Sequence, residues 1–123
     1  MAIARFVRMA REGQTIPVYG GGGSQRDYTY VDDAVRAILV SLDNPQDFSV
    51  LNVGGGNPIR LDALVRAVGT VTGCEIKTEI HPVQPGDVSL TWANPALIKE
   101  VLGWKAEVPV LDGLRKYVEW LDR

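Results

Sequence analysis

Two glycine runs in this chain of 123 residues are the first candidates for chemistry. The stretch from 19 to 35 reads YGGGGSQRDYTYVDDAV, so four glycines precede an Arg-Asp pair and two adjacent aspartates. A second run, Gly54–Gly56, follows the apolar segment VLNV. A glycine-rich turn can hold a phosphate when it joins a strand to the N-terminus of a helix, because free backbone amides meet the anion there. Both runs are therefore candidate phosphate loops.

Neither run has the spacing of a dinucleotide-binding turn. In G-x-G-x-x-G counted from Gly20, the third glycine position holds Gln25, and counted from Gly54 it holds Ile59. The segment after the first run is expected to be a strand, and neither run continues with the Lys and Ser/Thr of a P-loop. Tight turns with positive φ are the commoner use of such glycines. By themselves, the runs do not indicate a nucleotide site.

The charged residues after the first run have two interpretations each. Arg26 could hold a phosphate through two parallel hydrogen bonds, although an Arg-Asp pair more often forms a solvated ion pair. Asp32 and Asp33 could bind a metal or act as an acid–base couple. At the start of a helix, however, we expect them to cap the helix and to interact with its dipole. The single cysteine, Cys74, and the single histidine, His81, exclude an internal disulfide and a Cys/His zinc cluster.

Composition excludes several classes of partner. The net charge of −2 supplies no broad positive field, so we expect no general nucleic-acid binding. No apolar run approaches the roughly 20 residues needed to cross a bilayer, so we expect no membrane partner. Arg5, Arg8 and Arg11 interrupt the N-terminal apolar residues, which is not typical of a signal peptide. The expected location is cytoplasmic.

Hydrophobic periodicity and turn residues predict the elements that would position these side chains. We expect helices over residues 3–12, 33–42, 61–71, 95–102 and 110–121, and strands over residues 16–19, 27–31, 49–53 and 75–81. The predicted order is α-β-β-α-β-α-β-α-α. No linker is long enough to divide it, so the sequence predicts a single small α/β domain.

Five segments of the chain, taken together in their order, resemble a known family. They read IPVYGGGGSQRDYTYVDDAVRAI, VLNVGGGNPIRLDALVRAV, QPGDVSLTWAN, LGW and GLRKYVEWL. They are similar to the C-terminal part of the extended short-chain dehydrogenase/reductases, the NAD-dependent nucleotide-sugar epimerases and dehydratases. The QPGDV segment is most similar to the UDP-glucuronate 4-epimerase branch. The resemblance implies that residues 1–123 form the substrate-binding part of a Rossmann-type enzyme.

The resemblance also implies a role for five residues. Pro17 and Tyr19 would line a uracil pocket, and Arg26 would contact the pyrophosphate. Asp87 would accept a hydrogen bond from a ribose hydroxyl. Gln84 would stand at a second phosphate contact, where many relatives carry arginine, and its neutral amide would weaken that contact.

The catalytic features of this family are missing from the sequence. The family holds NAD in an N-terminal Rossmann domain and uses a Tyr-x-x-x-Lys pair, whose lysine lowers the pKa of the tyrosine so that it can act as a base. No tyrosine of this chain has lysine four positions later. We therefore expect no catalytic, cofactor or metal residue here, and no activity from the chain alone. Because relatives extend further upstream, Met1 is expected to be an internal methionine used as the start of a shortened gene or expressed fragment.

Three functional interpretations follow. The first is a fragment of an NAD-dependent epimerase or dehydratase that contributes UDP-sugar recognition, with weak or absent binding in isolation. Its helix 33–42, with Tyr28 and Tyr30, would face the absent Rossmann domain, so we expect self-association through that apolar surface. The second is a stand-alone ligand-binding or protein-interaction module without chemistry. The third is a subunit completed in trans by a Rossmann partner.

Overall fold

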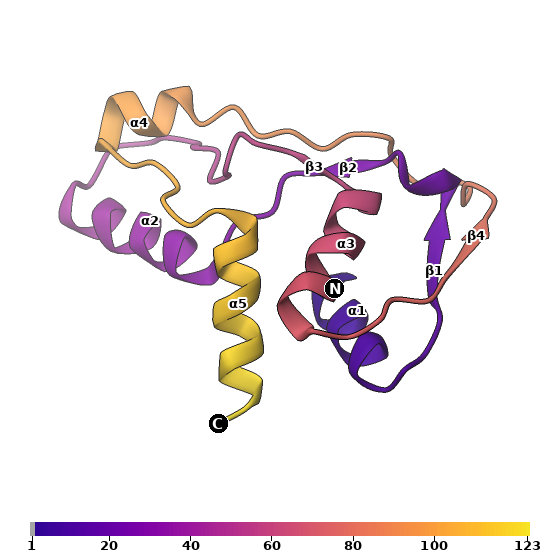
Figure 1. Ribbon diagram of the computed structural model, residues 1–123. Helices are drawn as coiled ribbons and strands as arrows, with labels where there is room; N and C mark the ends of the chain where they lie inside the picture. The colour runs from indigo at the N-terminus through magenta and orange to yellow at the C-terminus, as the bar shows by residue number, and fades with distance from the viewer. Residues whose placement is uncertain (1) are drawn as a thin grey trace.

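The computed structural model describes residues 2–123, and Met1 lies outside the described residues (Figure 1). Its elements are α1 (Ala2–Arg11), β1 (Ile16–Tyr19), the 3₁₀ turn η1 (Gly20–Gly22), β2 (Gln25–Arg26), α2 (Val31–Asp43), β3 (Ile59–Arg60), α3 (Leu61–Thr72), β4 (Thr78–His81), α4 (Ala96–Leu102) and α5 (Val110–Leu121). The predicted α/β class is confirmed, and helices and strands alternate in the predicted order, although β2 and β3 lie outside the residues predicted for the second and third strands and η1 is an addition.

The strands form two separate pairs. Strand β1 pairs in parallel with β4, which places Tyr19 opposite His81. Strand β2 pairs antiparallel with β3, and Gln25 also forms a parallel bridge with Leu90. The strand that carries Arg26 therefore has a neighbouring segment on each side.

The first lobe consists of α1, β1, α3, β4 and α5, and it contains the main core. Helix α3 packs against both α1 and α5. Its residues Leu64, Val65 and Val68 are buried because they recur on one face of the helix. The helix ends at Gly73, whose φ of 68° suits the left-handed position after a helix. The buried apolar residues of this lobe are Phe6, Val7, Ala10, Ile16, Val18, Leu64, Val65, Val68, Leu114 and Val118.

The second lobe consists of α2, α4 and residues 103–109, and it lies at the opposite end of the molecule from β1 and β4 (Figure 1). Its core contains only Ala37, Ile98 and Trp104 among the buried apolar residues. The apolar face of α2 points away from that core, since its large side chains are between 48% and 71% exposed. That face is formed by Val31, Val35, Ile38, Leu39 and Leu42.

Two predicted strands are wrong. Residues 27–30 take no regular structure and Val31 already begins α2, while residues 49–53 form no strand. The segment around 49–53 has a strand-like composition, but Phe48 and Val50 are exposed and no described segment pairs with it. A strand needs a partner as well as a suitable composition. The same rule shortens β4, which begins at Thr78 rather than at 75 because β1 offers only four residues for pairing.

The predicted capping role of the paired aspartates is also wrong. Both lie in the first turn of α2, as expected, but Tyr30 is the N-cap and no side chain caps the helix. Asp33 turns inward instead, and its carboxylate accepts hydrogen bonds from the backbone N–H groups of Glu107 and Val108. Asp32 stays exposed. The hydrogen bonds of Asp33 join the start of α2 to residues 107–108, two segments of the second lobe that are far apart in the sequence.

Candidate functional site

A pocket of about 240 Å³ lies beyond the carboxyl end of β1. It is lined by Tyr19, Gly20, Gly23, Ser24, Val83, Asp87, Val88 and Ser89. Asp87 is the one charged residue among these eight. The pocket therefore combines an aromatic wall, backbone groups of a glycine turn and a single carboxylate.

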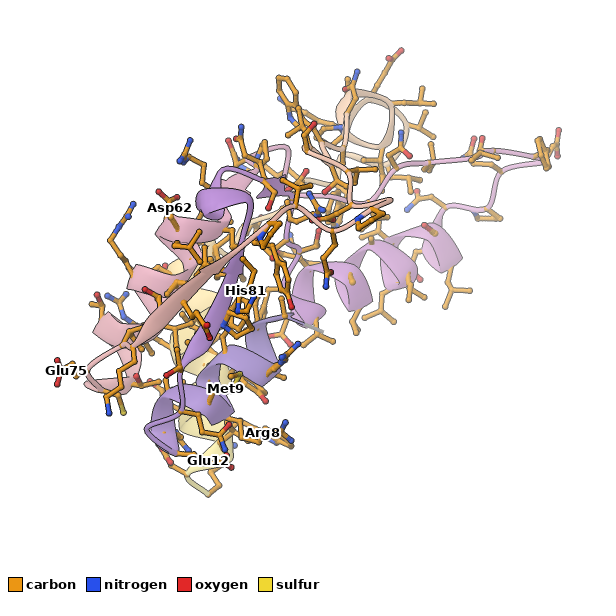
Figure 2. The ribbon with its side chains drawn as sticks, turned by 90° about the vertical axis from the view of Figure 1, so that its right-hand side faces the viewer. Arg8, Met9, Glu12, Asp62, Glu75 and His81 are labelled. Atoms are coloured by element: carbon orange, nitrogen blue, oxygen red, sulfur yellow. The ribbon has the colours of Figure 1, made fainter. Side chains whose placement is uncertain are left out.

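Strand β1 supplies the aromatic wall. Its residues alternate, with Ile16 and Val18 buried in the core and Pro17 and Tyr19 on the other face. The Tyr19 ring lies 5.3 Å from the ring of His81. His81, labelled in Figure 2, belongs to the neighbouring strand β4. Pro17 and Tyr19 also line an adjoining hollow of about 320 Å³ against α1. The structure thus places Tyr19 at both cavities and Pro17 only at the second.

The first glycine run is a tight turn packed on the start of α3. Gly20, Gly21 and Gly22 all have positive φ, at 57°, 64° and 77°. A Cβ atom added at Gly22 would lie 2.9 Å from the Cβ of Asp62, which Figure 2 shows beside this turn. The turn leads into strand β2 instead of a helix. The turn interpretation of this run is confirmed.

The QPGD segment forms the turn that holds Asp87. The backbone N–H of Asp87 donates to the carbonyl of Gln84 at 3.1 Å, and Gly86 between them has a φ of 83°. Pro85 and Gly86 therefore occupy the two central positions of a type II turn, which favours those residue types. Gln84 contributes its backbone carbonyl to this turn, and it does not line the pocket.

Arg26 and Asp87, which are 61 positions apart in the sequence, form an ion pair at this site. The distance from Nη2 of Arg26 to Oδ1 of Asp87 is 2.5 Å, and Nη1 of Arg26 donates to the carbonyl of Gln25 at 2.8 Å. The two side chains are 26% and 37% exposed. Arg26 is not among the residues that line the pocket. Asp87 therefore lies in the pocket wall, with the guanidinium held beside it.

Asp27 was missed as a site residue, and it explains the second glycine run. Its Oδ2 accepts hydrogen bonds from the backbone N–H groups of Gly56 at 2.9 Å and Ala93 at 3.1 Å. Its Oδ1 is buried and has no hydrogen-bond partner among the described residues. A Cβ at Gly54 would lie 2.3 Å from the Cβ of Ala93. The second glycine run therefore encloses an internal carboxylate, and we name these contacts the Asp27 clamp.

The Asp27 clamp continues along strand β2. The backbone N–H of Asp27 donates to Oγ1 of Thr91 at 3.3 Å, and the N–H of Thr91 donates to the carbonyl of Gln25 at 3.1 Å. The N–H of Gln25 in turn donates to the carbonyl of Ser89 at 2.8 Å. These bonds fix residues 89–93 beside β2. They also set the register that brings Asp87 next to Arg26, two residues before this paired segment.

The geometry of the glycine runs within residues 2–123 differs from that of a dinucleotide-binding turn. Neither glycine run joins a strand directly to the N-terminus of a helix, so the residues present do not fit a dinucleotide. Burial raises the pKa of Tyr28, and the charge of Arg26 opposes that rise. No group of three potential metal ligands gathers in the described chain. Its helices are also too short or too polar to cross a membrane.

Comparison with known proteins identifies the class. The family model described as GDP-mannose 4,6 dehydratase matches residues 1–117, and the chain belongs to that family. The resemblance to NAD-dependent nucleotide-sugar epimerases is confirmed by the relatives that follow.

The particular relatives are epimerases of UDP-sugars. A UDP-glucuronate 4-epimerase from Thermodesulfobacterium geofontis is 34% identical over 98% of this chain and 37% of its own length. The crystal structure of a UDP-glucose 4-epimerase with UDP-glucose from Thermotoga maritima matches with a TM-score of 0.92 and 30% identity, over 99% of this chain and 39% of that one. A Bacillus cereus UDP-glucuronic acid 4-epimerase in complex with UDP-glucuronic acid and NAD matches with a TM-score of 0.88 and 25% identity, over 98% and 40%. The chain thus spans about two fifths of the length of these relatives.

Proposed function

We propose that this chain is the UDP-sugar recognition part of an NAD-dependent nucleotide-sugar epimerase or dehydratase, and that it lacks the hydride-transfer site. The observation that carries the proposal is the Arg26–Asp87 ion pair at the edge of the Tyr19 pocket. Two residues so far apart in sequence are held together by a dedicated turn and by the Asp27 clamp. The UDP-sugars bound to the two structural relatives support this choice of ligand.

Each residue of the half-site has a proposed role. Pro17 and Tyr19 offer a flat apolar surface to the uracil ring. The Arg26 guanidinium binds the diphosphate, and the carboxylate of Asp87 accepts a hydrogen bond from the ribose. Gln84 supplies at most a neutral contact to the second phosphate. The hydride transfer at the sugar's C4 that the resemblance implies requires NAD and residues outside this chain.

Calorimetric titration with UDP and UDP-glucuronate tests this function. A half-site that is preformed in the isolated chain binds UDP at submillimolar concentration, and Arg26→Ala should then weaken that binding at least about tenfold, because a charge-assisted contact to the diphosphate is removed. Arg115→Ala is a matched control, since Arg115 forms a similar exposed ion pair with Asp112 on α5, away from the pocket. UDP binding that is identical in all three proteins would contradict the proposed role of Arg26. No binding at millimolar ligand would mean that the recognition site needs the rest of the parent enzyme.

We also propose that the apolar face of α2 is an interaction surface, on which copies of the chain associate when no Rossmann partner covers it. The exposure of Ile38, Leu39 and Leu42 on one helix face supports this second function. The segment 49–53, which has strand-like composition and no strand partner, adjoins the same lobe. A partner that supplies a sheet would satisfy both features, and that is the alternative of a subunit completed in trans.

Sedimentation over a range of concentrations tests the interaction surface. We expect the wild type to associate as its concentration rises, and Ile38→Glu to shift it toward the monomer because a charge cannot be buried there without a partner. Leu97→Glu is the control, since Leu97 is exposed to a similar degree on α4. A wild type that stays monomeric at high concentration would contradict self-association. Strong UDP binding by such a monomer would favour the stand-alone binding module instead.

A further inference from the structure

We propose that Asp87 is a specificity-determining residue that makes the Arg26 site select nucleoside diphosphates over bare diphosphate. The inference rests on the proposed function of this pocket as a UDP-sugar half-site. It adds a mechanism of selection. The carboxylate of Asp87 stays paired with the guanidinium of Arg26 until a ligand arrives that offers a hydrogen-bond donor to the carboxylate and an anion to the guanidinium.

The first support is that the guanidinium is already engaged. One terminal nitrogen of Arg26 is bound to Asp87 and the other to the carbonyl of Gln25. Asp87 lines the pocket and Arg26 does not. An anion that enters the pocket therefore meets a negative carboxylate first, and no cationic side chain lines the pocket to offset that repulsion.

The second support is that the backbone of Asp87 is fixed. Its N–H donates to the carbonyl of Gln84 within the type II turn, and two residues further along the carbonyl of Ser89 accepts a hydrogen bond from the N–H of Gln25 on β2. The loop cannot carry the carboxylate away without breaking these bonds. The ion pair can therefore open only by rotation of the Asp87 or Arg26 side chain.

The chemistry of the two ligand classes then decides which one binds. Bare diphosphate offers only negatively charged acceptor oxygens, so it competes with Asp87 for Arg26 and leaves the carboxylate without a hydrogen-bond donor. A nucleoside diphosphate brings ribose hydroxyls that can donate to Asp87 while its phosphates take the guanidinium. Both partners of the ion pair are then satisfied. Selection of this kind works by penalising the wrong ligand.

Parallel calorimetric titrations with inorganic pyrophosphate and with UDP, in buffer free of divalent cations, test the proposal. In Asp87→Asn we expect pyrophosphate to bind about tenfold more tightly, because one negative charge a few ångströms from the anion is removed. UDP should gain less or lose affinity, so that the preference for UDP over pyrophosphate falls by about tenfold. In the double variant Arg26→Gln/Asp87→Asn the gain for pyrophosphate should disappear.

Asp112→Asn is the matched control, because Asp112 forms an ion pair with Arg115 far from the pocket, and it should leave both affinities unchanged. An equal change for both ligands in Asp87→Asn overturns the selection role, even if UDP binding still depends on Arg26 and the proposed function stands. Unchanged pyrophosphate binding also overturns it, including the case in which neither ligand binds the wild type and Asp87→Asn gains none. UDP binding that does not depend on Arg26 removes the proposed function as well.

Discussion

The two lobes of this molecule are held together by different kinds of contact. In the first lobe, three helices and a parallel strand pair enclose a continuous apolar core around α3. In the second lobe, only three apolar residues are buried, and the contacts that join α2 to residues 103–109 are largely polar. The comparison teaches that the first lobe can bury its own apolar surface, whereas the second exposes most of the apolar face of α2.

Asp33 is the centre of the second lobe. It is 1% exposed, and its carboxylate accepts hydrogen bonds from the N–H groups of Glu107 and Val108 at 3.1 and 3.0 Å and pairs with Arg36. The indole N–H of Trp104 donates to the backbone carbonyl of Asp33 at 3.1 Å. Burial alone would raise the pKa of Asp33, but the two backbone donors and Arg36 together lower it below 3.8. Hydrogen bonds to Asp33 thus hold the segments of the second lobe together, whereas apolar packing holds the first lobe together.

The largest expected effect separates the two lobes directly. Leu64→Ala should lower the free energy of unfolding by about 3 kcal/mol, because a fully buried leucine leaves a cavity in the first-lobe core. Leu39→Ala on α2 is the matched substitution, and it should change stability by less than about 0.5 kcal/mol since Leu39 is 55% exposed. Urea denaturation of both variants at low protein concentration measures the difference. Equal losses would show that the apolar face of α2 is covered in solution.

Asp33→Asn should have the next largest effect, a loss of about 2 kcal/mol, because buried N–H donors lose a charged acceptor. The substitution should also change the pH dependence. Since the folded pKa of Asp33 lies below its ordinary value of 3.8, the unfolded chain binds more protons in acid. The contribution of Asp33 is therefore complete above about pH 4 and is lost as the pH falls further.

The measurement is the stability difference between wild type and Asp33→Asn from pH 7 down to pH 3. Asp62 also has a lowered pKa, through its hydrogen bond with Arg60, but it is present in both proteins and cancels in the difference. We expect the difference to shrink as the solution becomes more acidic. A constant difference would show that the second lobe does not depend on the charge of Asp33.

Local sequence signals predicted the first lobe better than the second. The bounds of β1 and α5 are confirmed, and α3 ends before Gly73 as expected, because these elements follow from periodicity and glycine punctuation. The strands expected over 27–31 and 49–53 failed because pairing depends on a partner that composition does not reveal. Residues with good local signals but no neighbour cannot form a sheet.

The site shows the same limit. Resemblance to the family supplied Tyr19, Arg26 and Asp87, and the structure brings the first and last into one pocket with Arg26 paired behind them. The inward roles of Asp27 and Asp33 could not be found in this way, because they accept hydrogen bonds from groups 66 and 74 positions away.

The smallest expected effect lies at the Asp27 clamp, which joins the segments between the lobes. Gly54→Ala should cost about 1 kcal/mol, because the added methyl would lie 2.3 Å from the Cβ of Ala93 and must push residues 91–93 away from Asp27. Gly23→Ala is the control, with its nearest atom 3.8 Å away and an ordinary φ of −77°, and it should be neutral in urea denaturation. If neither substitution changes the stability, the contacts of the Asp27 clamp adjust to the added methyl group without cost. If only Gly54→Ala is destabilising, the second glycine run leaves the space that the Asp27 carboxylate needs, and loosening it should also weaken UDP binding, because residues 89–93 set the position of Asp87 opposite Arg26.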